Sequence, residues 1–498
     1  MRAPGTKRGR RAAPATLDAR LVGHVTLEAR SDGNIVARFD GHSVGLGTFS
    51  AAAADHAHQL RAGLPLASFA SGRRPVDKEV ELLVRRLALH GLLEYRLGRS
   101  RNRGDRREDR DADQVVIEPQ VPHYWPQASQ LDAADVLVLS RFAYLRRRGN
   151  DMVLESPRSG ALFRICDPKV AAAVATLSAP QPLKRLRRQD GFPGVELLAL
   201  LVECRILFKL DAGSDSGLRP DEGDDSLVLW DFHDLLFHAR STEGRHANPM
   251  GGVYPYAGVM PSPPAVRPRW PGTPVDLREV AAAASPPLSP AAALLRERHS
   301  TRSFDDRRPI TLAELARFLD GAARVQSTWE SPLDFGDGGP VVEYAVRPYP
   351  SGGGSYGLEL YLAVNRCEGL ARGFYHYDAG GHALVPIGAR AQELDALLAG
   401  AGFAMDAPAA PQILITIAAR FGRTAWKYSS LAYALILKDA GVLTQTLYLM
   451  ATDMGLGGCA IGTANIDLFA RMTGIEFHVE GPVGQFALGR GMASEPSG

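Results

Sequence analysis

The longest apolar stretch of the chain, residues 431–458, most constrains the fold, because so long an apolar segment must be buried in protein or in a membrane. Its sequence, LAYALILKDAGVLTQTLYLMATDMGLGG, carries Lys438, Asp439 and Asp453. Charges within such a span count against a membrane helix and favour a helix buried inside a soluble protein. We therefore expect a soluble protein, with no membrane segment, that packs around this helix.

The size and composition of the chain bound its class. At 498 residues it is too long for one ordinary core, so we expect more than one domain. Hydrophobic residues make up 45% and charged residues 22%, which is typical of a globular protein, and a net charge of +2 gives no global reason to bind nucleic acid. The four cysteines are scattered, with no metal-ligand spacing, which argues against a metal site and disulfides and indicates a reducing, cytoplasmic location.

Three stretches lack a hydrophobic period and predict connections between domains. Residues 99–114 mix charges of both signs, and residues 211–226 are mostly Gly, Asp and Ser. Residues 246–276 are dense in proline and glycine, which predicts extended chain without regular structure. We accordingly expect linkers at 99–135 and 212–282.

The segments ahead of the first two linkers resemble each other. Each reads as strand, turn, strand, helix, and then a helix that leads directly into a short apolar strand; the turns are SDGN and RRGND. A winged-helix unit is built in this way. We predict two winged-helix-like α+β modules, at 21–98 and 136–211, after a basic, disordered tail at 1–20 that lacks the apolar region of a secretory signal.

The remaining segment, residues 283–498, alternates helices and strands, so the predicted fold class is α+β. Thr311 followed by Glu314 is a capping box that begins a helix over 311–325. Strands are expected at LELYLAVN, GFYHYD, QILITIAAR and GQFALGRG.

A basic motif directly precedes the capped helix. RHSTRSF supplies Arg298, Ser300 and Arg302, and LGRG adds Arg490 at the end of a strand. Forked, permanently charged donors with a hydroxyl suit the phosphate of a nucleotide or flavin. Because RxSxR is short, a solvated helix end stays open as the alternative.

Two glycine clusters could lie against a flat ligand. PSGGGSYGLELYL places three consecutive glycines before a strand, which allows close backbone approach but is also typical of a flexible hairpin tip. MGLGGCAIG follows the apolar helix, and its paired glycines either present amides to ring heteroatoms or form a helix C-cap.

Lys427 and Tyr428 stand side by side immediately before the apolar helix. Desolvating walls and a cationic or flavin neighbour would disfavour the ammonium, which makes Lys427 a candidate general base. A solvated lysine beside a packed tyrosine is the alternative.

In this order and spacing, RERHSTRSF, PSGGGSYGLELYL, GLGGCAIG and LGRG resemble the FMN-dependent nitroreductase superfamily. GFYHYD, WKYSSLAYALILKDAG and WDFHDLLFHARSTEGRH (230–246) narrow the resemblance to the SagB/ThcOx-type azoline dehydrogenases, relatives of the microcin B17 dehydrogenase and the cyanobactin oxidase. The resemblance covers 283–498, which it implies is a nitroreductase-like FMN-binding domain. The two N-terminal modules are similar to the peptide-clamp domains of cyanobactin-type oxidases.

The resemblance implies a role for each matching residue. Lys427 and Tyr428 match the catalytic pair. The implied FMN-binding residues are Arg298, His299, Ser300 and Arg302 for the phosphate and ribityl chain, Arg490 as a second phosphate contact, Ser351, Gly352 and Gly353 along the isoalloxazine, and Gly457 and Gly458 presenting amides to the ring. The glycine loop departs from the usual S-G-G-A-x-x-P, because this chain has Gly354 and Gly357 there.

The implied activity is FMN-dependent oxidation of peptide thiazolines or oxazolines to thiazoles or oxazoles, in the biosynthesis of ribosomally made peptides. The implied partners are a second copy of the chain, with FMN at the interface of a homodimer, an azoline-containing precursor peptide and a cyclodehydratase. The modules would hold peptide by strand addition.

Two other functions remain possible from the residues. A generic NAD(P)H-dependent nitro- or quinone reductase would use the same flavin site but would not need the duplicated modules. A winged-helix DNA-binding regulator needs a basic, exposed recognition helix, whereas KEVELLVRRLALHGLL is largely apolar with acidic residues interspersed.

Overall fold

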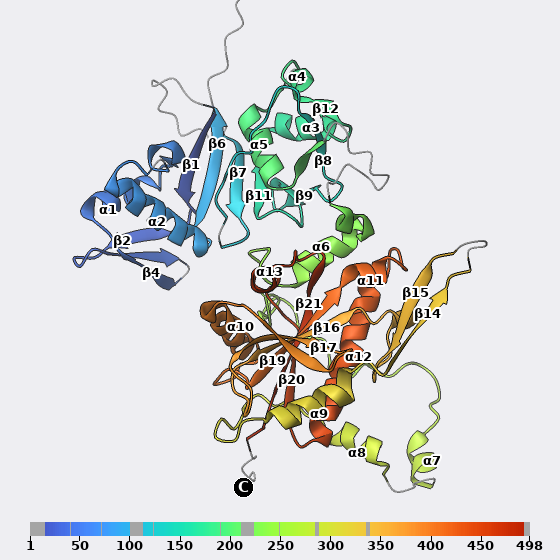
Figure 1. Cartoon of the computed structure of the whole chain (residues 1–498). Coiled ribbons are helices and arrows are strands. Elements are labelled where there is room, and N and C mark those ends of the chain that lie inside the picture. Colours follow the sequence, from blue (N-terminus) through green and yellow to red (C-terminus); the bar gives the residue numbers. More distant parts are fainter. Residues whose placement is uncertain are drawn as a thin grey trace, which may run out of the picture. The chain divides into compact units, whose positions relative to one another are not determined.

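The structure is a computed structural model that describes residues 15–39, 41–70, 72–99, 113–122, 124–189, 191–210, 224–248, 250–283, 288–334 and 339–492. The chain divides into two compact units, residues 1–247 and 248–498 (Figure 1). In the described parts of the chain, no helix combines the length and the apolar character needed to cross a membrane.

Unit 1 contains two copies of one element order. The first copy runs β1 (Ala15–Leu21), β2 (Thr26–Ala29), β3 (Asn34–Phe39), β4 (His42–Thr48), α1 (Ala51–Gln59), β5 (Leu64–Pro65), η1 (Leu66–Ser68), α2 (Pro75–Leu89) and β6 (Leu93–Arg99). The second runs β8 (Val136–Leu139), β9 (Tyr144–Arg148), β10 (Asp151–Glu155), β11 (Ala161–Ile165), α3 (Pro168–Thr176), β12 (Gln181–Pro182), α4 (Leu183–Leu186), α5 (Val195–Glu203) and β13 (Leu207–Leu210). In each copy the first strand lies between a two-residue strand and the last strand, in the orders β5-β1-β6 and β12-β8-β13. The predicted disordered tail at 1–20 is wrong for residues 15–20, which belong to β1, and its residues 1–14 lie outside the described residues.

The predicted linker at 99–135 is wrong in part, because it contains strand β7 (Asp113–Pro119). β7 pairs with β6 on one side and with β11 on the other, which joins the two copies in one seven-stranded sheet. Its Val115, Val116 and Ile117 are buried. The charged run before them, of which 100–112 lie outside the described residues, obscured this short β-branched strand in the sequence.

The predicted linker at 212–282 is also wrong in part, because it contains η4 (Asp225–Leu229), α6 (Phe232–Ser241) and α7 (Leu277–Ala283). Helix α6 belongs to unit 1, since Arg240 pairs with Glu155 of β10 at 3.1 Å. The proline-rich part, residues 251–276, has no helix or strand and is exposed, as predicted.

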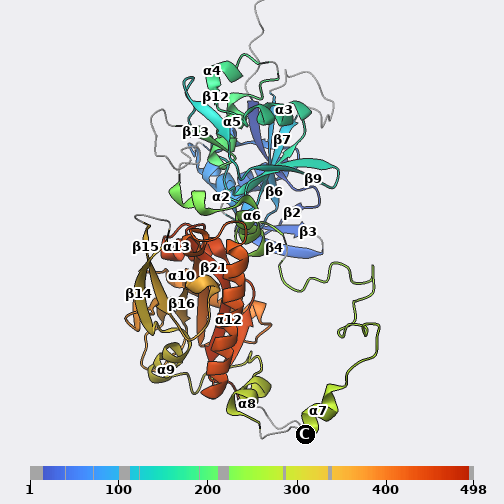
Figure 2. The same ribbon diagram turned by 90° about the vertical axis from the view of Figure 1, so that its right-hand side faces the viewer.

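Unit 2 is built on a six-stranded antiparallel sheet in the order β18-β17-β16-β19-β21-β20. Its elements after α7 are α8 (Pro290–Glu297), α9 (Leu312–Ala323), β14 (Ser327–Pro332), β15 (Val341–Val346), η5 (Gly352–Gly354), β16 (Leu358–Val364), β17 (Gly373–Asp378), β18 (Ala383–Ile387), α10 (Ala391–Ala404), β19 (Ile413–Arg420), α11 (Phe421–Ala425), α12 (Ala432–Asp453), β20 (Gly457–Ile461), α13 (Ile466–Thr473) and β21 (Glu480–Gly489). The long helix α12 crosses one face of the sheet, and α10 and α13 cover the other face (Figures 1 and 2). The predicted α+β class is confirmed.

The apolar stretch that dominates the sequence forms α12, and its burial is one-sided. Ile436, Leu443 and Leu447 are buried on the face toward the sheet, whereas Ala434 and Lys438 are exposed. Asp439 and Tyr448 are buried on the two flanks of the apolar face. The two polar side chains therefore stand where loops from either side of the helix can reach them.

The capping box at Thr311 stabilises the first turn of helix α9. Thr311 Oγ1 accepts a hydrogen bond from Glu314 N at 3.2 Å, and Glu314 Oε2 accepts one from Thr311 N at 2.9 Å. We expect Thr311→Ala to lower the free energy of unfolding by about 1 kcal/mol, because the N–H of Glu314 loses its acceptor. Thermal unfolding should show this loss, and Thr311→Ser, which keeps the oxygen, should stay near wild type. Equal losses for both variants would contradict a role for the hydroxyl.

Candidate functional site

The segment that carries the predicted phosphate motif lies beside the edge strand β20. Thr301 N donates a hydrogen bond to Gly458 O at 2.8 Å. The approach requires glycine at position 457, because a Cβ there would lie 2.6 Å from Thr301 Cγ2. Gly457 and Gly458 are thus in a strand and not in a helix C-cap, and they adjoin the predicted phosphate motif.

Tyr448 of α12 organises the residues of this motif. The Arg298 guanidinium carbon lies 5.0 Å from the centre of the Tyr448 ring, and Ser300 Oγ lies 2.8 Å from the Tyr448 hydroxyl. The same hydroxyl accepts a hydrogen bond from Ala460 N at 2.8 Å. We call Arg298, Ser300, Tyr448, Gly457 and Gly458 the phosphate group.

The donors of the phosphate group, together with Arg302 and His299 of the same motif, suit an anion. Within the described residues, neither Arg298 nor Arg302 takes part in an ion pair, and His299 is exposed. If the Tyr448 hydroxyl donates to Ser300 Oγ, the Ser300 hydrogen is free for a further acceptor. Two guanidinium groups and a hydroxyl without an acidic partner are the chemistry that a phosphate dianion requires.

The predicted glycine loop is held by the other flank of α12. The buried carboxylate of Asp439 accepts a hydrogen bond from Ser351 Oγ at 2.6 Å and from Gly352 N at 3.0 Å. Ser351 Oγ in turn accepts one from Tyr356 N at 2.9 Å. A buried carboxylate needs such donors, so Asp439 and the loop stabilise each other.

The loop meets the predicted catalytic pair at Gly353. Lys427 Nζ donates a hydrogen bond to Gly353 O at 2.8 Å. Gly353 has φ of 60°, and a Cβ on it would lie 2.0 Å from the Tyr428 hydroxyl oxygen. The structure therefore brings Ser351, Gly352, Gly353, Lys427 and Tyr428 together, and we call these five residues the base group.

An aromatic pair lies next to the base group. Trp329 of β14 and Tyr344 of β15 are opposite each other in the hairpin, and their rings stack with centroids 5.4 Å apart. Lys427 Nζ lies 6.0 Å from the centre of the Tyr344 ring, and 48% of Trp329 is exposed. The base group thus has an exposed, flat apolar surface at its side.

The phosphate group and the base group are on different sides of α12. Asp439 and Tyr448 are nine positions apart, which is about two and a half turns of helix, so their side chains leave the axis in roughly opposite directions. One chain therefore does not bring all the predicted FMN residues to a single face of α12.

Arg490 belongs to neither group. Its Nη2 lies 2.7 Å from Glu314 Oε1 and 2.8 Å from Oε2, and its Nε donates to Arg308 O at 3.1 Å. The hydrogen bonds from Thr311 and Arg490 lower the pKa of Glu314 against the opposing effect of burial. Arg490 therefore ties the end of β21 to the start of α9, and its role as a phosphate contact stays a prediction.

Lys427 does not have the surroundings expected from the sequence. Its side chain is exposed, so apolar walls that would desolvate its ammonium are not formed by the described residues around it. What the chain supplies is position: the Gly353 carbonyl fixes the amine, and the Tyr428 ring centre is 5.5 Å from Nζ.

A second polar cluster lies on the other face of the sheet, under α10 and α13. Tyr361 donates a hydrogen bond to Glu480 Oε1 at 2.6 Å, and burial raises the pKa of Glu480. A hydrogen bond between His376 Nε2 and Glu359 Oε2, at 3.4 Å, raises the pKa of His376. Glu359 also pairs with Arg420 at 3.1 Å, so these groups have partners, and neither the phosphate group nor the base group includes them.

One set of described residues brings three possible metal-ligand atoms within 4.8 Å of one another: Asp231, His233 and Asp234 at the start of α6. It lies in unit 1, whereas every residue predicted for the flavin site lies in unit 2, and His233 Nε2 is 3.2 Å from Asp234 Oδ1. This is an ordinary imidazole–carboxylate contact, and we assign no ion to it.

Comparison with known proteins finds a family match within each unit. The family described as "Cyanobactin oxidase ThcOx" matches residues 137–247, and the nitroreductase family matches residues 295–490. A protein of Methanocaldococcus jannaschii that is named as a nitroreductase is 30% identical over 169 residues, which cover 34% of this chain and 76% of that protein. The chain belongs to the nitroreductase family. The two family matches also confirm the predicted resemblance to SagB/ThcOx-type dehydrogenases and identify an oxidoreductase.

Solved structures are similar at lower identity. The E. coli microcin synthetase McbBCD complex with truncated pro-MccB17 bound is 19% identical, with a TM-score of 0.38, and covers 54% of this chain and 97% of that chain. A nitroreductase of Desulfovibrio desulfuricans in complex with FMN is 16% identical, with a TM-score of 0.25, and covers 42% of this chain and 91% of that chain.

Two residues of the nitroreductase unit that organise the site are not predicted from the sequence. In the sequence Asp439 serves only as a charge that counts against a membrane helix, and Tyr448 does not stand out. A signal exists for Asp439, because a carboxylate in an apolar helix must find donors. For Tyr448 the sequence offers only a hydroxyl within an apolar run.

Two alanine variants separate the contact of Gly353 with Tyr428 from the strain that a positive φ causes in any residue with a Cβ. Gly353 and Gly354 both have positive φ, so alanine at either position costs about 1–2 kcal/mol of conformational energy. Only at 353 does a Cβ clash with Tyr428, since the nearest atom to one at 354 is Tyr344 Cδ1 at 3.9 Å. We expect Gly353→Ala to lower the thermal unfolding temperature and the oxidoreductase activity more than Gly354→Ala does. Equal effects of the two variants would show that Gly353 does not contact the Lys–Tyr pair.

Proposed function

We propose that this nitroreductase-family protein is an FMN-dependent dehydrogenase that oxidises thiazolines or oxazolines in a peptide to thiazoles or oxazoles. The observation that carries the proposal is the placement of Lys427 and Tyr428 directly on Gly353 of the loop predicted to line the flavin. The match of residues 137–247 to the cyanobactin oxidase family supports a peptide substrate over a small nitro compound.

The residues of the phosphate group and the base group fit FMN. Arg298 and Ser300 offer donors for its phosphate, and Arg302 is proposed to join them. Gly353 and Gly457 allow Tyr428 and Thr301 to approach the backbone of the loop and of β20, which fixes these segments next to the proposed ligand. Bound FMN would supply the redox chemistry by accepting a hydride from the substrate ring.

The chain itself has to move a proton and hold the ring. Formation of the aromatic ring removes a proton from the α-carbon and a hydride from the adjacent ring carbon, and a C=C bond forms between them. Lys427 as the neutral amine takes the proton on Nζ and becomes the ammonium, which the Gly353 carbonyl stabilises by its hydrogen bond. Tyr428, beside it, donates its hydroxyl hydrogen toward the charge that develops on the carbonyl oxygen attached to the α-carbon.

We also propose that two copies of the chain build each flavin site. The phosphate group and the base group leave α12 in roughly opposite directions, so a second copy has to bring its base group to the phosphate group of the first. Closure against the second copy would also cover Lys427 and supply the desolvating walls that one chain does not. The further partners are an azoline-containing precursor peptide and a cyclodehydratase that forms the azolines.

The role of Lys427 can be tested by substitution. Lys427→Ala should keep bound FMN, visible in the absorption spectrum, but slow azole formation by about 10²–10⁴-fold, because the proton acceptor is lost. Mass spectrometry of an azoline peptide, which loses two hydrogen atoms per ring, measures the rate. Lys438→Ala, at an exposed lysine of α12, is the matched control and should behave as wild type. Normal turnover by Lys427→Ala would remove its assignment as base, and a colourless protein that takes up no FMN would remove the proposed function.

Mixed dimers test whether each site spans two chains. One chain carries Arg298→Ala with Ser300→Ala, the other carries Lys427→Ala, and each variant alone should be inactive. When the two are co-expressed, half of the dimers are mixed, and one of the two sites in each mixed dimer has only intact groups. Azole formation should therefore return to about a quarter of the wild-type level. No recovery in a preparation shown to contain mixed dimers would place each site within one chain.

The alternative, a generic NAD(P)H-dependent nitro- or quinone reductase, uses the same flavin. Rapid reduction of the bound flavin by NADPH, with no oxidation of azoline peptides, would favour it.

A further inference from the structure

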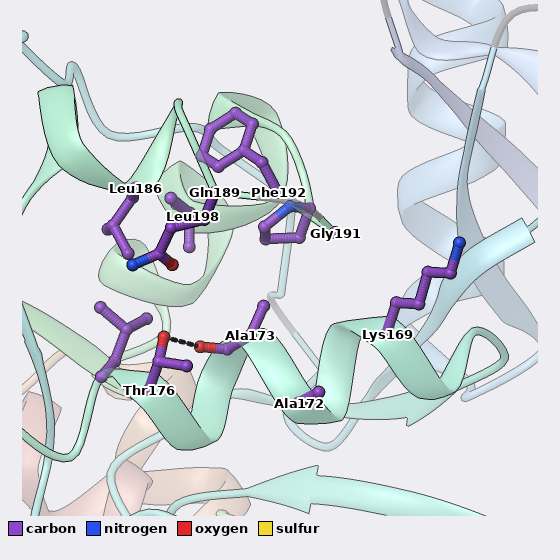
Figure 3. A pocket seen from close by; sticks show the side chains of 11 residues that line it. Lys169, Ala172, Ala173, Thr176, Leu186, Gln189, Gly191, Phe192 and Leu198 are labelled. Atoms are coloured by element: carbon purple, nitrogen blue, oxygen red, sulfur yellow. Dashed lines mark hydrogen bonds between the residues drawn. The ribbon is translucent and has the colours of Figure 1, made fainter.

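A small apolar pocket lies in the second copy of unit 1. Its volume is about 210 Å³. The lining comes from α3, from the turn after α4 and from α5: Lys169, Ala172, Ala173, Thr176, Leu177, Leu186, Gln189, Gly191, Phe192, Pro193 and Leu198. Figure 3 shows the α3 side chains along one wall, Leu186, Gln189 and Phe192 along the other, and Lys169 at one end. The volume is below the roughly 300–1,000 Å³ of sites for small-molecule ligands, so it suits a single large apolar side chain.

The pocket adjoins a basic depression. Gln189 lines both the pocket and a second, shallow hollow whose other lining residues are Pro182, Lys184, Arg185 and Arg188. The side chains of Lys184, Arg185 and Arg188 are exposed, and in the ranges that the structure describes none of them forms an ion pair. The described lining of the two hollows includes no acidic residue.

The first copy of unit 1 shows that the fold does not require these charges. Pro65 and Pro182 end the equivalent strands β5 and β12, and both are followed by a short helix. Leu66 begins this helix in the first copy and Leu183 begins it in the second, and both residues are buried. Three positions further on, Phe69 is buried as Leu186 is.

At the positions between and directly after these anchors, the two copies differ in charge and in side-chain size. By the same alignment, the first copy has Ala67, Ser68, Ala70 and Ser71 where the second has Lys184, Arg185, Arg187 and Arg188. The first copy therefore forms the turn with neutral, small residues, and the four positive charges of the second copy serve something other than the turn.

We propose that this surface binds an acidic peptide segment, with one large apolar side chain in the pocket and flanking carboxylates on Lys184, Arg185 and Arg188. A central apolar anchor surrounded by charged contacts is the usual division of work in peptide recognition. Nucleic acid is the less suitable partner, because the lining formed by the described residues is mostly aliphatic and Phe192 is the one aromatic residue in it, whereas single strands are held by successive stacking rings. The proposal rests on unit 1 alone and does not depend on the proposed redox activity.

Fluorescence anisotropy with the full-length protein tests the proposal. The probe is a short fluorescein-labelled peptide in which one leucine is flanked by aspartates and glutamates. The charge variant replaces Lys184, Arg185, Arg187 and Arg188 by the residues of the first copy, Ala, Ser, Ala and Ser, and should weaken binding about tenfold or more. The pocket variant Ala173→Leu fills the space for the probe's leucine and should weaken binding by a similar factor.

Matched controls separate binding from folding. Ala175→Leu adds the same side chain to α3 at an exposed position outside the pocket lining and should bind as wild type does. Equal melting temperatures and unchanged FMN content would show that the charge and pocket variants are folded. Replacing the probe's leucine by alanine should reproduce the effect of Ala173→Leu.

Two results would overturn the proposal. One is equal affinity for the acidic probe and for a probe with lysines in place of its acids. The other is loss of binding in the charge variant but not in Ala173→Leu, together with competition by a single-stranded oligonucleotide, which would mean a general polyanion surface. Either result leaves the redox proposal intact, because flavin content and azole formation are measured separately.

Discussion

The hydrogen bonds from Ser351 and Gly352 to the buried carboxylate of Asp439 are the interaction on which the candidate site depends. Asp439 is only 8% exposed and stands in the helix that packs against the central sheet. A carboxylate in that position would be destabilising without donors, and the loop would have no fixed position without the carboxylate. Their mutual satisfaction holds the Gly353 carbonyl where Lys427 can donate to it.

Close approach of backbone segments then sets the geometry of each half of the site. Gly353 admits the Tyr428 hydroxyl, and Gly457 admits Thr301, at distances that leave no room for a Cβ. Helix α12 serves both halves, with Asp439 on one flank and Tyr448 on the other. The placement of the two half-sites on opposite flanks of one helix is the observation that supports the proposed pairing of two chains.

Unit 1 uses one topology for two different surfaces. Both copies bury the same pair of apolar anchors after the short strand, Leu66 and Phe69 in one and Leu183 and Leu186 in the other. The positions between and directly after the anchors differ in charge. Burial constrains the residue type at the anchors, whereas exposed positions can change without loss of stability. The first copy therefore serves as a reference for the residues that the fold of the second copy requires.

Local pattern is sufficient to predict much of the fold. The capping box at Thr311, the long buried helix and the strands of the nitroreductase unit follow from hydrogen bonds and hydrophobic periods a few residues long, which the sequence displays directly. The order of the glycine and arginine motifs along the chain likewise indicates the flavoprotein family. Contacts between distant residues, in contrast, are decided only by the tertiary structure.

Three features of this chain show why contacts between distant residues do not follow from local sequence. β7 is a strand because β6 and β11 offer it two edges, and Arg490 points at Glu314 because β21 ends beside the start of α9. The pairing of Asp439 with the glycine loop and the contact of Lys427 with it depend on chain segments that are about 75–90 positions apart. Local sequence determines which groups need partners, but packing of the whole unit selects the partners, because satisfying a buried charge or a strand edge is a property of the space around it.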